Sequence, residues 1–181
     1  MAVEVKYDDK IFELFISKEE IEEIVVRIAK EVDAHYSDIA DDIMLISILD
    51  GSFVFMADLV RQIEHQVEIQ FVKLNSYDNM LSRGEVAHIL KLQHSIEGKH
   101  VLVVEDIIDT GLTLEVFIEE LQKHNPKSIK TCTLLSKPEI HNDIVSTDFV
   151  GREIGPEFVI GYGLDIDGRA RQLPAIYRLK V

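Results

Sequence analysis

The sequence predicts an α/β fold in which a mainly parallel sheet is covered by helices. Two apolar runs of strand length, residues 43–49 and 101–104, are rich in β-branched side chains and indicate buried strands. Apolar residues at helical spacing follow each run. Because strands alternate with helices along the chain, the pattern favours the α/β class over an all-β or an all-α protein.

The first helix has the clearest boundary. Ser17 and Glu20 have the spacing of a capping box, and apolar residues at helical intervals follow them, which predicts a helix over residues 18–36. A second helix is expected from Phe53 onward. The alternating segment 67–74 predicts a strand with one face toward water. Further strands are expected at residues 85–92, 129–135 and 175–181.

The length, net charge and cysteine content of the chain limit the kinds of function it can have. The 181 residues fit one domain, and the net charge of −14 argues against nucleic-acid or anionic-membrane partners, which require basic surfaces. A polyanionic substrate would therefore call for a divalent cation as a bridge. The one cysteine, Cys132, lies in an apolar run and is expected to be a buried, inert thiol. Without a secretory pattern or a long apolar span, a cytoplasmic location is expected.

The most informative segment is residues 101–113, VLVVEDIIDTGLT. The apolar strand is followed by the carboxylates of Glu105, Asp106 and Asp109, and then by a small, hydroxyl-bearing turn that opens a helix. Such a turn offers backbone N–H groups to a phosphate, while the carboxylates can accept hydrogen bonds from sugar hydroxyls. The alternative is that Asp109 and Thr110 merely cap the helix.

The whole segment resembles the phosphoribosyl-diphosphate signature of the type I phosphoribosyltransferases, in the form typical of the 6-oxopurine branch. The resemblance covers nearly the whole chain. It implies a doubly wound, mainly parallel sheet with helices on both faces and a small hood. We expect one domain over residues 1–181, with a core of about 37–155 and a hood of about 1–16 and 156–181.

The resemblance also implies roles for individual residues. Asp109 is the expected general acid or base at the purine N7, and Ser76 and Tyr77 are expected in a lid loop. Residues implied to bind the ribose and its 5′-phosphate are Glu105, Asp106, Ile107, Ile108, Thr110, Gly111, Leu112 and Thr113. Those implied for the diphosphate are Asp50, Gly51 and Arg171, and those for the purine are Lys137, Phe158, Val159 and Asp165. Magnesium is the implied cofactor, near Asp165, Glu105 and Asp106.

The implied reaction transfers the phosphoribosyl group from phosphoribosyl diphosphate to hypoxanthine, and to guanine, in purine salvage. A homodimer or homotetramer is expected. A regulatory protein that senses phosphoribosyl diphosphate and a xanthine-preferring sister enzyme are the alternatives.

Two places depart from the family pattern. The Leu-x-Gly element, which in the family commonly contains a cis peptide, has Asp50 where lysine is frequent. Residues 166–170 lack the aromatic often found before the diphosphate-binding arginine, so Arg169 is a possible second contributor.

Overall fold

The structure, a computed structural model, describes residues 3–38, 42–73, 92–141 and 144–180. Its larger sheet has five strands in the order β4-β3-β5-β6-β7, and every neighbouring pair is parallel. Their bounds are β3 Ile43–Leu49, β4 Glu68–Lys73, β5 His100–Ile108, β6 Ser128–Ser136 and β7 Phe149–Glu153. The helices are α1 Lys18–His35, α2 Phe53–Val60, α3 Leu112–Gln122 and the short α4 Pro138–His141.

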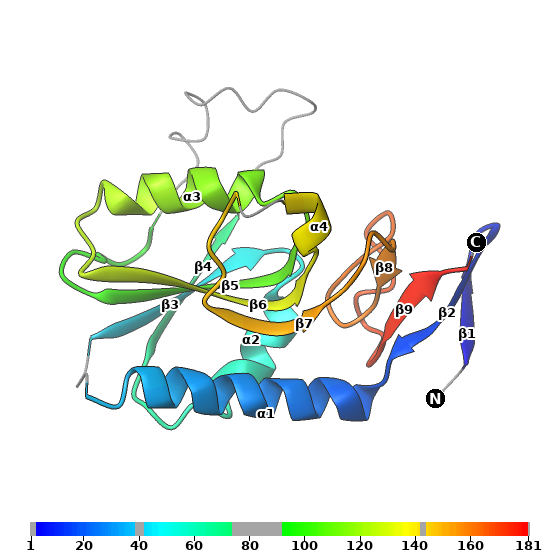
Figure 1. Cartoon of the computed structure of the whole chain (residues 1–181), viewed down its shortest axis with the longest axis horizontal. Helices are drawn as coiled ribbons and strands as arrows, with labels where there is room; N and C mark the ends of the chain where they lie inside the picture. Colours follow the sequence, from blue (N-terminus) through cyan, green and yellow to red (C-terminus); the bar gives the residue numbers. More distant parts are fainter. Residues whose placement is uncertain (1–2, 39–41, 74–91, 142–143, 181) are drawn as a thin grey trace.

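Helices cover both faces of this sheet, as Figure 1 shows: α1 and α2 lie on one face and α3 lies on the other. The predicted fold class is therefore confirmed. Within the described residues, no helix combines the length and the apolar character that crossing a membrane requires.

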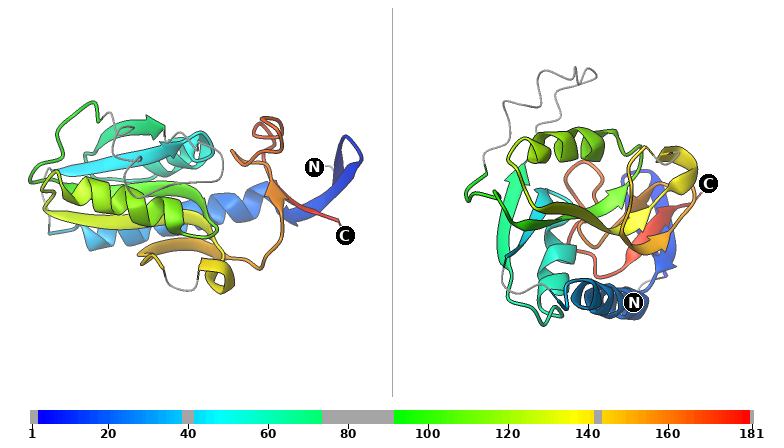
Figure 2. Two further views of the ribbon diagram at one scale, coloured as in Figure 1. Left: turned by 90° about the horizontal axis from the view of Figure 1, so that it is seen from above. Right: turned by 60° about the vertical axis from the view of Figure 1, so that its left-hand side comes forward.

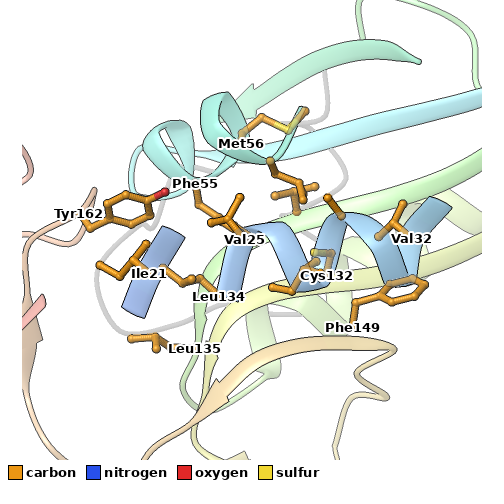
Figure 3. Packing of buried hydrophobic residues seen from close by; sticks show 14 of the residues in the cluster. Ile21, Val25, Val32, Phe55, Met56, Cys132, Leu134, Leu135, Phe149 and Tyr162 are labelled. Atoms are coloured by element: carbon orange, nitrogen blue, oxygen red, sulfur yellow. The ribbon is translucent and has the colours of Figure 1, made fainter. Parts of the chain in front are cut away.

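Helix α1 begins where the capping box predicts. The Ser17 hydroxyl accepts a hydrogen bond from the Glu20 backbone N–H, and the Glu20 carboxylate accepts one from the Ser17 N–H. The apolar face of α1 packs on the sheet and on α2, with Ile21, Val25 and Val32 buried. Figure 3 shows this layer, in which the buried thiol of Cys132 packs as an apolar side chain.

Strand β5 divides the two cores. Leu102 and Val104 pack into the cluster under α1 and α2, whereas Val101 and Val103 pack with Phe117 of α3 on the opposite face. A strand buried on both faces requires apolar residues at successive positions, which explains the uninterrupted run in the sequence. Strand β4 lies at the sheet edge and alternates between exposed and buried residues, as predicted.

A smaller antiparallel sheet, which we call the hood, is built from segments near both ends of the described chain. Its strand order is β1-β2-β9-β8, with bounds β1 Glu4–Tyr7, β2 Lys10–Ile16, β8 Val159–Ile160 and β9 Ile176–Leu179. Figure 2 shows the segments β1–β2 and β9 side by side there, beyond the carboxyl ends of the strands of the larger sheet. The hood has its own small core, which includes Phe12, Ile160 and Tyr177.

One boundary differs from the predictions. Strand β5 continues through Ile108, so Glu105 and Asp106 lie within the strand and not in the following turn. Pairing with β6 causes this extension, because Glu105, Ile107 and Ile108 all have partners on that strand. Helix α3 begins at Leu112, within the turn that was predicted to open it. The expected strand 85–92 lies almost wholly outside the described residues.

Candidate active site

The candidate site lies at the carboxyl edge of the parallel sheet, where the hood approaches it. The ends of parallel strands in such folds carry loops that bind ligands. Four segments meet there: the turn after β3, the end of β5 with its turn into α3, the residue after β6, and the 161–171 loop of the hood.

The turn after β3 is in close contact with β5. The Leu49–Asp50 peptide is cis, as the resemblance implies. Gly51 follows, and a Cβ placed on it would lie 1.8 Å from the Asp106 Oδ2. On the other side, a Cβ on Gly163 would lie 2.1 Å from the Gly51 carbonyl oxygen. Only glycine at these two positions lets the turn, the strand and the hood loop approach so closely.

The 161–171 loop of the hood carries an ion pair near the contact between Gly163 and Gly51. The Arg171 Nη2 lies 2.9 Å from the Asp165 Oδ1, and the Arg171 Nη1 donates a 2.6 Å hydrogen bond to the Gly163 carbonyl. The Gly168 N–H donates a 2.7 Å hydrogen bond to the other Asp165 oxygen. Arg169, the possible second contributor, instead pairs with Asp8 of the hood.

Glu105 and Asp106 are acids inside a largely apolar strand. Burial raises the pKa of Asp106 to about 6, although backbone N–H groups of Ile107 and Asp106 and the Arg171 guanidinium lower it. Burial also raises the pKa of Glu105 well above its ordinary value, and the Asp106 carboxyl raises it further. The Glu105 Oε2 is buried without a hydrogen-bond partner among the described residues. Such acids can accept hydrogen bonds from hydroxyl groups or bind a cation.

The turn into α3 forms a small pocket of about 150 Å³. Its lining residues are Glu105, Ile107, Ile108, Asp109, Thr110, Gly111, Thr113 and Leu114. Gly111 is the N-cap of α3, with a φ of 78°, and no side chain caps the helix there. The simple capping alternative for Asp109 and Thr110 is therefore wrong. The first backbone N–H groups of an uncapped helix suit an anion such as a phosphate.

Lys137 and Asp109 face each other across this edge. The Lys137 Nζ lies 3.4 Å from the Asp109 Oδ1, and the Lys137 N–H donates to the Ile108 carbonyl, which ties the lysine to the end of β5. Lys137 is buried, whereas 54% of the Asp109 side chain is exposed. Its exposure leaves the carboxylate free to meet a substrate.

Phe158 is half exposed and therefore is not an ordinary core residue. Its ring packs at a tilt against Phe12, with 6.2 Å between the ring centroids. The next residue, Val159, is buried in β8. An exposed aromatic face on a supported ring is suited to stacking on a planar base.

Three of the residues expected at the candidate site are not placed there by the structure, and one residue that was not expected lies at it. Ser76 and Tyr77 lie outside the described residues. Leu112, expected at the phosphate, is half exposed at the start of α3. Lys73, which the sequence analysis did not single out, bonds to both Asp50 oxygens. Its place could have been found only from the pairing of β4 with β3. Among the described residues, no three His, Cys, Asp or Glu side chains form a preassembled metal-binding group.

Comparison with known proteins identifies the fold family. The model of the phosphoribosyl transferase domain matches residues 17–167. The hypoxanthine-guanine phosphoribosyltransferase of Bacillus subtilis (strain 168) is 42% identical over 97% of this chain and 96% of its own. The hypoxanthine phosphoribosyltransferase of Escherichia coli (strain K12) is 41% identical over 91% and 93%, respectively.

A solved structure gives the same result. The structure of a hypoxanthine phosphoribosyl transferase from Trypanosoma cruzi, studied for the role of its C-terminal region in oligomeric state and activity, has a TM-score of 0.86. It is 35% identical, and the match covers 97% of this chain and 95% of that one. Sequence and structure therefore agree that this chain belongs to the phosphoribosyltransferase domain family.

Proposed function

We propose that this protein transfers the 5-phosphoribosyl group of phosphoribosyl diphosphate to a 6-oxopurine, hypoxanthine or guanine, in purine salvage. The products are the nucleoside 5′-monophosphate and diphosphate. The observation that carries the proposal is the convergence of the 105–113 segment with Gly51 and the Arg171–Asp165 pair at one sheet edge. Relatives at about 40% identity that carry these activities in their names support it.

The substrate's charged groups have suitable partners. In the proposal, the N-terminus of α3 holds the 5′-phosphate, and Glu105 and Asp106 accept hydrogen bonds from the ribose hydroxyls. The Gly51 turn and Arg171 meet the diphosphate, since a guanidinium binds phosphate oxygens through paired hydrogen bonds. The unpartnered Glu105 Oε2 leaves an acceptor available for such a hydroxyl.

The purine lies between the hood and Lys137. Phe158 stacks on its ring, Val159 contacts it through the backbone, and the Lys137 ammonium donates to its exocyclic oxygen. Asp109 accepts the N7 proton while N9 attacks the anomeric carbon, and the bond from that carbon to the diphosphate breaks. The 3.4 Å distance between the Lys137 Nζ and the Asp109 Oδ1 supports this assignment, because the two groups can then act on the same purine.

Magnesium suits the oxygen donors present. The Asp165 carboxylate lies close enough to raise the pKa of Asp106, and Glu105 adds a buried oxygen. Magnesium is commonly held by one or two carboxylates together with substrate phosphates. When bound, it would neutralise the charge that develops on the departing diphosphate. We further propose that the protein acts in the cytoplasm as a homodimer or homotetramer.

The direct test is steady-state diphosphate release with magnesium and phosphoribosyl diphosphate, offering hypoxanthine, guanine, xanthine, adenine and uracil separately. Turnover with hypoxanthine or guanine is expected. Preference for xanthine would identify the sister enzyme instead. No turnover with any base, while phosphoribosyl diphosphate still binds, would contradict the proposal and favour a ligand sensor.

A further inference from the structure

The turn that precedes Gly51 carries an acid where a polyanion is proposed to bind. The Asp50 carboxylate is half exposed at the end of β3. Both of its oxygens accept hydrogen bonds from the Lys73 Nζ, at 3.0 and 2.8 Å. The pairing arises from the sheet itself, because Leu49 and Lys73 are register partners at the ends of neighbouring parallel strands.

Two other cations at this edge are also paired with aspartates. Lys137 lies beside Asp109 at 3.4 Å, and Arg171 lies beside Asp165 at 2.9 Å. Lys137 is buried, and Arg171 is also bonded to the Gly163 carbonyl, so both are held in place. Lys73 differs from them, because 58% of its side chain is exposed.

An exposed pair of this kind is weak, since water screens the two charges and the long lysine side chain loses freedom in forming it. A lysine is a point charge on a flexible stem, and it can turn from one anion to another at little cost. A diphosphate beside Gly51 would carry more negative charge than the Asp50 carboxylate and would compete for the same ammonium group.

We propose that Lys73 is a diphosphate-binding residue of this protein, and that Asp50 holds it beside the Gly51 turn until the ligand arrives. The inference rests on the proposed function, because it assigns a new contact to the diphosphate part of that site. Lys73 thereby supplies a positive charge next to a turn whose own side chain is acidic.

The test separates the diphosphate from the rest of the substrate. Isothermal titration is carried out with inorganic diphosphate plus magnesium, and separately with inosine 5′-monophosphate, which carries no diphosphate. Lys73→Met should weaken diphosphate binding and raise the KM for phosphoribosyl diphosphate about tenfold or more, the usual effect of losing a hydrogen bond between charged groups. Nucleotide affinity and kcat should stay unchanged, and Lys73→Arg should retain most of the affinity.

Asp50 variants separate direct binding from simple neutralisation of the acid. Asp50→Asn should bind diphosphate at least as tightly as the wild type, because Lys73 is then free. The double variant Asp50→Asn/Lys73→Met should recover only part of the loss. Lys99→Met is the control, since Lys99 pairs with Glu68 at the amino end of β4, away from the candidate site, and this variant should bind diphosphate normally.

Several results would overturn the proposal. Full recovery in the double variant would mean that Lys73 only neutralises Asp50. Normal diphosphate binding by Lys73→Met, or an equal loss of nucleotide binding, would also overturn it. The binding measurement does not depend on turnover. A wild-type protein that binds diphosphate but transfers the phosphoribosyl group to no purine would contradict the proposed function. The Lys73 assignment would then still be judged by the diphosphate affinities of the Lys73 variants.

Discussion

The large parallel sheet and the hood contribute to the candidate site in different ways. The sheet supplies Asp106, Asp109 and Lys137 from strand ends and their turns, where two apolar cores fix the backbone. The hood supplies Phe158, Asp165 and Arg171 from short strands and loops over a small core. One link between the two parts is the 2.5 Å hydrogen bond from the Tyr162 hydroxyl to the Asp58 Oδ2 of α2. In the proposed reaction, the sheet positions the reacting groups, whereas the hood holds the groups that meet the purine and the diphosphate.

The largest expected effect is at the sheet. Asp109→Asn should lower kcat by about 10²- to 10⁴-fold, because a positioned acid or base contributes about that much. Phosphoribosyl-diphosphate affinity should change little. Single-turnover rates and ligand titration measure the two quantities separately. Asp9→Asn, at an exposed position between β1 and β2, is the control. Unchanged turnover in Asp109→Asn would refute the role assigned to Asp109.

The second prediction concerns the pH dependence of stability. Asp106 has a pKa of about 6 in the folded protein against 3.8 for an ordinary aspartate. The folded state therefore binds more protons between these values, and the free energy of unfolding of the unliganded protein should fall as pH rises from about 4 to 6. Asp106→Asn should remove this loss and raise stability at pH 7.5 by about 2–3 kcal/mol, while abolishing activity.

Urea unfolding at pH 4.5 and 7.5 measures this effect. Asp148→Asn is the contrast, because the Asp148 carboxylate accepts hydrogen bonds from the Thr131 N–H and the Lys130 Nζ and should be needed for stability. Destabilisation by Asp106→Asn at pH 7.5 would contradict this prediction, because it would show that the ionised Asp106 carboxylate stabilises the unliganded protein.

A hood residue should affect binding and not folding. Phe158→Leu should raise the KM for the purine about tenfold, since aromatic stacking on a base contributes about 1–3 kcal/mol. The free energy of unfolding should change little because the ring is 48% exposed. Phe71→Leu, an aromatic of similar exposure on β4, is the control for both measurements. An equal rise in KM for the two variants would argue against stacking.

The smallest effect is expected at the link between the two parts. Tyr162→Phe should cost about 1 kcal/mol of stability, the typical contribution of one hydrogen bond, and should weaken phosphoribosyl-diphosphate binding modestly. Tyr36→Phe is the matched control, because the Tyr36 hydroxyl is buried without a partner in the described part of the chain. Thermal unfolding should show a loss only for Tyr162→Phe. Identical behaviour of the two variants would mean that the link does not hold the hood.

Local features of the fold could be predicted well. The capping box at Ser17 and the two-sided burial of β5 each arise from neighbouring residues, and the structure confirms them. Strand β4 has one face toward water as predicted, but that face carries Ile69 and Phe71 while Gln70 is buried, so tertiary packing chose the face. The end of β5 was predicted too early, because Glu105 and Asp106 are polar and their place in the strand depends on pairing with β6.

The residues proposed to carry the chemistry can be named from the sequence, since the 101–113 segment holds its acids, its glycine and its helix start within a few positions. Their environments depend on the tertiary structure. It buried Asp106 against Gly51, left Asp109 exposed beside Lys137, and joined Arg171 to Asp165 and Gly163. It also brought Lys73 to Asp50, 23 positions away, through the parallel pairing of two strands. Burial and charge pairing depend on which distant segments become neighbours, and that is a property of the folded sheet, not of any short stretch of sequence.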